Sequence, residues 1–325
     1  MFLLTNKIPF PKNYERFIEL GQEAAKENNL LEAVYYYEQA YAIWQDFPLN
    51  LVLVNMYLET GENEQALSLA SEMKEKYFAY LDYLELYIQI LIQNHLFIQA
   101  HSIINERILM EQSGEMRKLI SLKKKIRHVE LMYRNFEVSK IKELKEELED
   151  LNTQNYYEQL GLVKKAGQLP QDEFIAIGKK ILLDGRIHNL VRSWILEELV
   201  SLHVKEEIEF LWRDNKKYTV IPASIGGPLD SAAYQRILLF LEKELINDDL
   251  ILLVDVLEEI RLHFALLYPL ADDIIENPKL WAISYIISYN HSIAQKFQID
   301  GKRTEIEKIQ KIQSKIRFEL ETMVL

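Results

Sequence analysis

A few residue types in this sequence stand at spacings that could support chemistry. Glu259 and His263 are four residues apart, a spacing that places two metal ligands on one face of a helix. Ser224 and Ser231 flank a double glycine in KYTVIPASIGGPLDS, and a hydroxyl beside a glycine loop can act as a nucleophile when a histidine supplies the base. The chain has no cysteine, which excludes disulfides, zinc-thiolate centres and thiol catalysis.

None of these arrangements completes a catalytic pattern. The segment ASIGGPLDS has neither the lysine of a phosphate-binding loop nor a G-x-G-x-x-G spacing, and no G-x-S-x-G surrounds either serine. A lone Glu and His pair beside Leu262 and Phe264 is more often a satisfied pair than a metal site. The acidic group Asp272, Asp273 and Glu276 fits the first turn of a helix as well as a hard-cation site. We therefore expect no catalytic residues, no metal and no cofactor.

Length and charge narrow the classes further. The 325 residues exceed one ordinary core, so two or more units or an elongated array are expected. A net charge of −12 argues against nucleic acid or anionic lipid as the main partner. The chain starts with only a short apolar run before Thr5, too short for a signal peptide, and its most apolar stretch carries Asp255 and Arg261. We expect a soluble, cytoplasmic protein with no membrane partner.

The elements that would position binding residues repeat along the first third of the chain. FIELGQEAAKENNLLEAVYYYEQA contains two helical patterns with a polar break between them, and Ala33 and Tyr37 share one face of the second. LVLVNMYLETGENEQALSLASEM and YLELYIQILIQNHLFIQAHSIINER repeat the form, so that Ala33, Ala66 and Ala100 keep register at intervals of 33 and 34 residues. An ordinary helical bundle with coincidental spacing is the alternative.

In these residues the chain resembles tetratricopeptide-repeat (TPR) proteins, whose helix-turn-helix units have a Leu-Gly pair, a small residue and an aromatic residue at set positions. The first copy matches through Leu20, Gly21, Ala33 and Tyr37, whereas the second has Val54 at the glycine position and the third is degenerate. Further along, YTVIPA and LHFALLYPLADDIIENPKLW resemble the tail of an uncharacterised TPR-containing family of low-GC Gram-positive bacteria. That resemblance implies a fold and a soluble location but no activity.

Beyond the repeats, the sequence predicts long helices, further helical pairs and one pair of strands. Asp184 and Arg192 are placed as in HEAT-type repeats, where such a pair ties successive helical hairpins. Ile208 and Phe210 alternate with glutamates, and Tyr218 follows the turn-forming RDNK, which predicts a β-hairpin. The expected class is all-α, an α-α superhelix of TPR-like and then HEAT-like hairpins, with a small β-hairpin inserted before a C-terminal helical module. The expected segments are 1–113 for the TPR-like repeats, 114–152 for long connecting helices, 153–204 for HEAT-like hairpins, 205–229 for the β-hairpin and Gly/Pro loop, and 230–325 for the C-terminal helical module.

The resemblance also implies where a partner would bind. In stacked helical hairpins the first helix of each pair lines a concave side on which peptides commonly lie. The polar residues that the repeat register places there are Gln22, Lys26, Asn55, Glu59, Glu85, Gln89 and Gln93. Amides suit such a role because each can donate to and accept from a peptide backbone. The alternative is that all seven are simply solvated.

The chemistry of the partner follows from a motif that is missing. Some TPR proteins grip C-terminal carboxylates with a clamp of Lys, Asn and Arg, but the corresponding positions here hold Ile18, Gln22, Asp82 and Leu86. Because Asp82 and Glu85 would repel a carboxylate, a peptide in this groove should be neutral or basic.

Two functions from different classes remain open. The first is a non-enzymatic scaffold or adaptor that binds a protein or peptide in the repeat groove, with self-association through the C-terminal module as a further contact. The alternative is a regulator that contacts nucleic acid through the basic stripe 117–127, which includes Lys123, Lys124 and Lys125. The acidic run EELED at 146–150 and the net charge favour a solvated helix over a nucleic-acid site.

Overall fold

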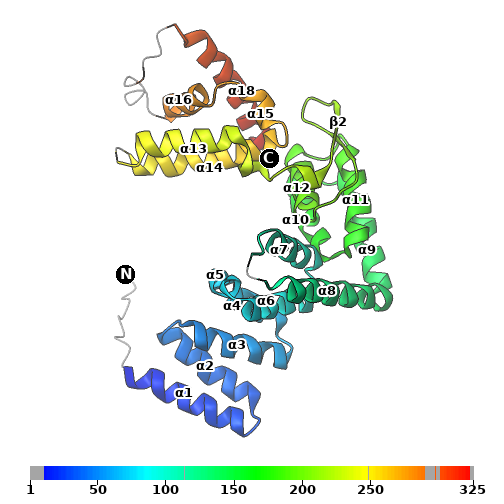
Figure 1. Ribbon diagram of the computed structural model, residues 1–325, viewed down its shortest axis with the longest axis vertical. Helices are drawn as coiled ribbons and strands as arrows, with labels where there is room; N and C mark the ends of the chain where they lie inside the picture. The colour runs from blue at the N-terminus through cyan, green and yellow to red at the C-terminus, as the bar shows by residue number, and fades with distance from the viewer. Residues whose placement is uncertain (1–10, 113, 248, 290–296, 298–300, 323–325) are drawn as a thin grey trace. The chain divides into compact units, whose positions relative to one another are not determined.

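The computed structural model describes residues 11–112, 114–247, 249–289, 297 and 301–322. Residues 1–10, in which we expect no signal peptide, lie outside this range. The described part is helical except for one two-stranded antiparallel sheet, so the predicted all-α class is confirmed (Figure 1). The chain forms two compact units, Met1–Ala100 with Lys124–Val129, and His101–Lys123 with Glu130–Leu325.

Helices of the first unit follow one another in pairs. They are α1 (Pro11–Lys26), α2 (Leu30–Ile43), α3 (Phe47–Thr60), α4 (Asn63–Glu72), the short α5 (Lys74–Ala79), α6 (Leu81–Gln93) and the start of α7 (Phe97–Leu109). α2 packs between α1 and α3, and α4 packs on both α3 and α6. Each helix therefore contacts the next in a serial arrangement, as in repeat proteins.

The turn inside each pair has the same backbone geometry. Asn28, Gly61 and His95 all adopt left-handed conformations, with φ of 61°, 82° and 58°. In each turn the following amide donates to the carbonyl five residues earlier, at 2.9, 2.7 and 2.9 Å, which is the Schellman pattern that ends a helix. The repeat is thus present in the backbone of all three turns, although the side chain at that position differs each time.

Small residues at one repeat position let the two helices of a pair approach closely. Ala33, Ala66 and Ala100 are fully buried, as their common register predicts. In the first pair Gly21 faces Tyr37, and a Cβ atom at Gly21 would lie only 2.7 Å from the tyrosine ring. The first pair therefore requires glycine where the helices cross.

The repeat pattern in the sequence does not predict the short helix α5. α4 ends at Glu72 and α5 begins at Lys74, with Tyr77 fully buried. The Tyr77 hydroxyl donates to Oδ1 of Asn50 at 2.7 Å, and the Asn50 amide in turn donates to the Tyr41 hydroxyl at 3.1 Å. Because a buried amide is costly unless it is hydrogen-bonded, this tertiary contact explains a break that local helix preference does not.

The second unit contains the later half of α7 and all elements after it, apart from residues 124–129 of α8. Its helices, including the 3₁₀ turns η1 to η4, and its two strands are α8 (Met116–Phe136), α9 (Val138–Glu149), η1 (Leu151–Thr153), α10 (Tyr156–Lys165), η2 (Ala166–Gln168), α11 (Gln171–Leu183), α12 (Asn189–Ser201), β1 (Ile208–Leu211), β2 (Lys217–Val220), η3 (Pro222–Ser224), η4 (Pro228–Asp230), α13 (Ala232–Leu245), α14 (Leu250–Leu267), α15 (Ala271–Ile274), α16 (Pro278–Tyr289) and α18 (Arg303–Glu321).

Asp184 and Arg192 meet in the turn between α11 and α12, but not as a charge pair. Arg192 donates to the backbone carbonyls of Asp184 and Ile187 at 2.9 and 2.7 Å. The Asp184 carboxylate accepts from Arg186 and, at 2.7 Å, from Asn152 after α9. The contact to the preceding helical segment is thus made by Asp184 with Asn152. Arg192 stabilises the turn between α11 and α12.

The predicted β-hairpin is confirmed. β1 pairs antiparallel with β2, with Phe210 opposite Tyr218, and the two rings stack with their centroids 5.8 Å apart. Two strands alone are marginally stable in water. β1 packs on α11, and Ile208 and Phe210 are buried, which supplies the missing support.

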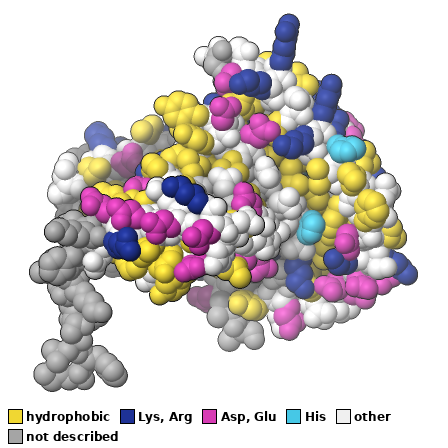
Figure 2. Space-filling view, turned by 90° about the horizontal axis from the view of Figure 1, so that it is seen from below, with side chains coloured by type: hydrophobic (Ala, Val, Ile, Leu, Met, Phe, Trp, Pro, Cys, Tyr) yellow, Lys and Arg dark blue, Asp and Glu magenta, His cyan; other side chains and the backbone are white. Residues whose placement is uncertain are grey.

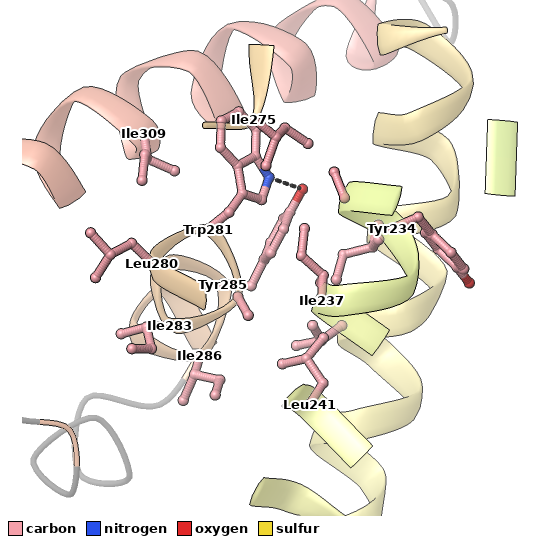
Figure 3. Packing of buried hydrophobic residues seen from close by; sticks show 14 of the residues in the cluster. Tyr234, Ile237, Leu241, Ile275, Leu280, Trp281, Ile283, Tyr285, Ile286 and Ile309 are labelled. Atoms are coloured by element: carbon pink, nitrogen blue, oxygen red, sulfur yellow. Dashed lines mark hydrogen bonds between the residues drawn. The ribbon is translucent and has the colours of Figure 1, made fainter. Parts of the chain in front are cut away.

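The core of the C-terminal helices is shared by α13, α14, α16 and α18. Ile237 and Leu241 from α13 lie opposite Trp281 and Tyr285 from α16 (Figure 3). The Trp281 indole donates to the Tyr285 hydroxyl at 3.2 Å, so these large rings are buried with their polar atoms hydrogen-bonded.

We expect Gly21→Ala to lower the stability of the first unit. The added methyl overlaps the Tyr37 ring, and overpacking of this kind costs about 1–3 kcal/mol, against a gain of about 1 kcal/mol in helix propensity. Urea unfolding followed by circular dichroism measures the change. Gly161→Ala in α10 is the matched control, because nothing lies within 4 Å of its Cβ position, and it should leave the midpoint unchanged or raise it. Equal midpoints for the two variants would contradict the close crossing of α1 and α2.

Candidate functional site

A groove of about 450 Å³ opens between α1 and α3 in the first unit. Its lining residues are Tyr14, Glu15, Ile18, Glu19 and Gln22 from α1, Tyr37 from α2, and Asp46, Pro48, Leu49 and Val52 at the beginning of α3. This volume lies in the range of roughly 300–1,000 Å³ that is common for ligand pockets.

Helical spacing explains which side chains reach the groove. Ile18 and Gln22 are four residues apart on α1, and Leu49 and Val52 are three apart on α3, so each set occupies one helix face. The α1 face is amphipathic, since Ile18 lies among two carboxylates and an amide, whereas the lining residues within α3 are apolar.

One carboxylate connects the beginnings of the two helices. Asp46 caps α3 by accepting from the Leu49 amide at 2.8 Å, and its other oxygen accepts from the Tyr14 hydroxyl at 2.9 Å. Burial and the Asp46 carboxylate raise the pKa of Tyr14, so the phenol stays protonated and can donate this bond. Asp46 thus fixes the end of the groove.

The groove is acidic. Glu15, Glu19 and Asp46 line it, and the described residues of its lining include no lysine or arginine. Arg16 contacts Glu19 at 3.3 Å, but the two side chains are 60% and 62% exposed, so this pair is weak. Figure 2 shows one face of the molecule, on which Asp and Glu side chains lie among hydrophobic side chains and among Lys and Arg.

All seven residues predicted to bind a partner are exposed on first helices of the pairs. Gln22 and Lys26 lie on α1, Asn55 and Glu59 on α3, and Glu85, Gln89 and Gln93 on α6. Gln22 lines the groove, and the other six are not among the lining residues.

Two of the predicted residues have partners within the chain. Asn55 donates to the carbonyl of Leu51 in its own helix at 2.7 Å. Glu85 accepts from Lys125 at 3.1 Å, with both side chains about half exposed. A partner would therefore have to compete for these two groups.

Sequence reasoning missed most of the groove itself. The predicted residues do not include Leu49 and Val52, because only polar positions of the repeat register are selected, nor Tyr14 and Asp46, which stand at the beginnings of α1 and α3. A signal is present for one of them, since Asp46 stands two residues before Pro48, and an aspartate just before a proline in a first helical turn is a typical N-cap.

The basic stripe 117–127 is the solvent face of an amphipathic helix. Leu119, Leu122 and Ile126 bury the opposite face of α8. Lys123 donates to Asn105 and Lys125 to Glu85, so two of the stripe's cations are engaged within the protein.

Glu259 and His263 belong to a buried polar chain in the C-terminal core. The His263 Nδ1 atom lies 2.6 Å from the Tyr285 hydroxyl, its Nε2 atom lies 3.2 Å from Glu259, and Arg317 donates to Glu259 at 2.6 Å. Burial, together with nearby arginine charges, lowers the pKa of His263 to about 3. The Tyr285 hydroxyl also accepts from Trp281 at 3.2 Å, whereas the Nε2 atom of His263 lies near Glu259 without making a hydrogen bond to it.

The remaining chemistry-bearing residues serve the backbone. Asp272 accepts from the amides of Ala232 and Ala233 at 3.1 and 2.7 Å, at the beginning of α13. Ser231 caps the same helix, and Ser224 donates to a carbonyl in its own turn.

Within the described part of the chain, no group of three or more His, Asp or Glu side chains is placed to hold a metal. Among the described helices, none is long and apolar enough to cross a membrane.

Glu198 on α12 is a glutamate whose pKa is strongly raised in the second unit. Burial, followed by the negative charge of Glu197, raises its pKa to about 7. The side chain is half-buried. Because its pKa is raised on folding, the native protein holds this proton more tightly than the unfolded chain does.

The geometry defines the class of the first unit. Paired helices with one left-handed turn geometry, buried alanines in register and first helices that line a groove are the features of a tetratricopeptide-type helical repeat. The chain is similar to the TPR repeat-containing protein YsoA of Bacillus subtilis (strain 168), with 27% identity over 287 residues, which cover 85% of this chain and 83% of that protein. The resemblance to a TPR-containing protein of low-GC Gram-positive bacteria is thus confirmed. No family model and no solved structure matches.

Asp46→Ala should destabilise the first unit by about 1 kcal/mol through loss of the α3 cap, and it should also release Tyr14. Asp46→Asn is the matched variant, because asparagine caps a helix about as well as aspartate. Urea unfolding should show a lower midpoint for the alanine variant than for the asparagine variant. Identical midpoints would show that the cap does not stabilise α3.

Glu198→Gln should flatten part of the pH dependence of stability. With the native pKa at about 7 and the ordinary pKa of a glutamate at 4.5, the wild-type protein loses stability from this group as pH rises from about 4.5 to about 7. The variant, which cannot ionise, should therefore gain in melting temperature relative to the wild type between pH 5 and pH 8. Thermal melts of both proteins at these pH values give the difference, in which contributions of His188 and His263 cancel. A difference that is constant with pH would contradict the raised pKa.

Proposed function

We propose that the protein is a non-enzymatic interaction scaffold that holds a peptide segment of a partner protein in the groove between α1 and α3. The observation that carries this proposal is the groove itself, 450 Å³ in volume and lined by aliphatic side chains together with exposed hydrogen-bonding groups. Pockets with an apolar lining and a few placed polar groups are typical binding sites.

The groove is organised before any partner arrives. Asp46 fixes the beginning of α1 relative to α3 through Tyr14, and the turn at Asn28 and the glycine at position 21 fix α1 on α2. A rigid site loses less conformational entropy on binding, which supports a role in recognition.

The proposed site extends along the same helix faces. Asn55 is one turn beyond Val52 on α3, and Lys26 is one turn beyond Gln22 on α1. An extended peptide would leave the groove along these polar residues. Similarity to a TPR repeat-containing protein supports protein partners in general.

Binding of nucleic acid to the stripe 117–127 stays a prediction, as does self-association through the C-terminal module. Since Lys123 and Lys125 are engaged within the protein, no observation favours the nucleic-acid function as a second proposal. Salt-sensitive retention on a nucleic-acid column would be its test.

The full chain, immobilised as bait, should enrich peptides from a random-peptide display library. Val52→Arg should weaken those peptides at least about tenfold, or about 1.4 kcal/mol, because it fills the groove with a long charged side chain. Leu31→Arg on α2 is the matched control, since Leu31 is 69% exposed and does not line the groove, and it should leave binding unchanged.

Circular dichroism must show that both variants keep the wild-type helix content. If the enriched peptides bind Val52→Arg as well as they bind the wild type, or if no peptide is enriched, the proposed function is wrong.

A further inference from the structure

We infer that the groove selects segments in which an aliphatic or aromatic side chain is flanked by lysine or arginine. The inference rests on the proposed function and goes further, because it names the chemistry of the partner segment. It follows from how apolar and acidic groups are distributed around the groove.

The floor of the groove is apolar. Leu49 is buried, Ile18 is half-buried and Val52 is 40% exposed, and all three line the same space with Pro48. An aliphatic or aromatic side chain placed there would remove this surface from water, at about 25 cal/mol for each Å² of apolar area buried. The floor thus supplies affinity for an apolar anchor but does not discriminate among anchors by charge.

The rim on α1 is acidic on successive turns. Glu15 and Glu19 are four residues apart and exposed, so their carboxylates lie on one helix face, roughly 6 Å apart at the Cβ atoms. Among the described residues, Arg16 pairs with Glu19, and this pair is exposed and weak. An incoming cation can therefore replace Arg16 at little cost.

The rim on α3 is acidic as well, and it is held in place. Asp46 already accepts from Tyr14 and Leu49, but each carboxylate oxygen has a second lone pair. A lysine or arginine near the end of the groove would find this fixed negative charge between the helix beginnings. Charge-assisted hydrogen bonds to such a carboxylate are roughly twice as strong as neutral ones.

The same charges exclude acidic segments. Among the described residues that line the groove there is no cation to neutralise a carboxylate ligand. Further along the first helices, Glu59 and Asp82 are exposed and add to the negative potential. An acidic peptide would lose through repulsion what its apolar anchor gains.

The test compares charge reversals with the same display library and the full chain. Peptides enriched by the wild type should combine an apolar residue with an adjacent lysine or arginine. The double variant Glu15→Lys/Glu19→Lys should weaken a synthetic copy of the most enriched peptide at least tenfold, and Glu15→Gln/Glu19→Gln should weaken it less. Raising the salt concentration should weaken wild-type binding, because exposed charges are screened.

The matched control is Glu23→Lys/Glu27→Lys, which reverses two exposed charges with the same spacing, outside the groove lining. It should bind like the wild type. Enriched peptides that are lost in Val52→Arg but lack basic residues, or that ignore Glu15→Lys/Glu19→Lys, would overturn the charge selectivity and leave the proposed function standing. Peptides that are insensitive to Val52→Arg would overturn the proposed function instead.

Discussion

The close approach of the two helices in each N-terminal pair is the constraint on which the first unit depends. Ala33, Ala66 and Ala100 have no exposed surface, and at the first crossing even a methyl group on Gly21 would overlap Tyr37. When helices pack this closely along the chain, the first helix of each pair turns one face into the stack and the other to solvent. The face left over is the one that lines the groove.

The turns between paired helices share one backbone geometry, which makes the packing repeat along the chain. A left-handed conformation costs little for glycine and more for residues that carry a Cβ atom, yet Asn28 and His95 adopt the same conformation as Gly61. The hydrogen bond that closes each turn and the buried alanine that follows five residues later outweigh that cost. The backbone repeat is therefore more regular than the side chains suggest, which accounts for a degenerate third copy that still folds as a pair.

Much of this architecture could be predicted from the sequence, because it depends on local patterns. The register of the alanines and the alternation around Phe210 and Tyr218 led to the helical pairs and the β-hairpin. What could not be predicted depends on contacts between distant residues, such as the break before α5, which Tyr77 and Asn50 decide. The groove belongs to the same category, since Tyr14 and Asp46 are brought together from 32 residues apart.

The polar residues that could form a site are of two kinds. They differ in how much of their hydrogen-bonding capacity is already used within the protein. Asp272 accepts from backbone amides with both of its oxygens, and the Nδ1 atom of His263 is hydrogen-bonded to the Tyr285 hydroxyl. These hydrogen-bonding atoms are already used within the fold. Glu15 and Gln22 are exposed beside an apolar floor. Their hydrogen-bonding groups therefore bind water as long as no partner segment occupies the groove. In the proposed function, a partner segment displaces this water and binds to these groups.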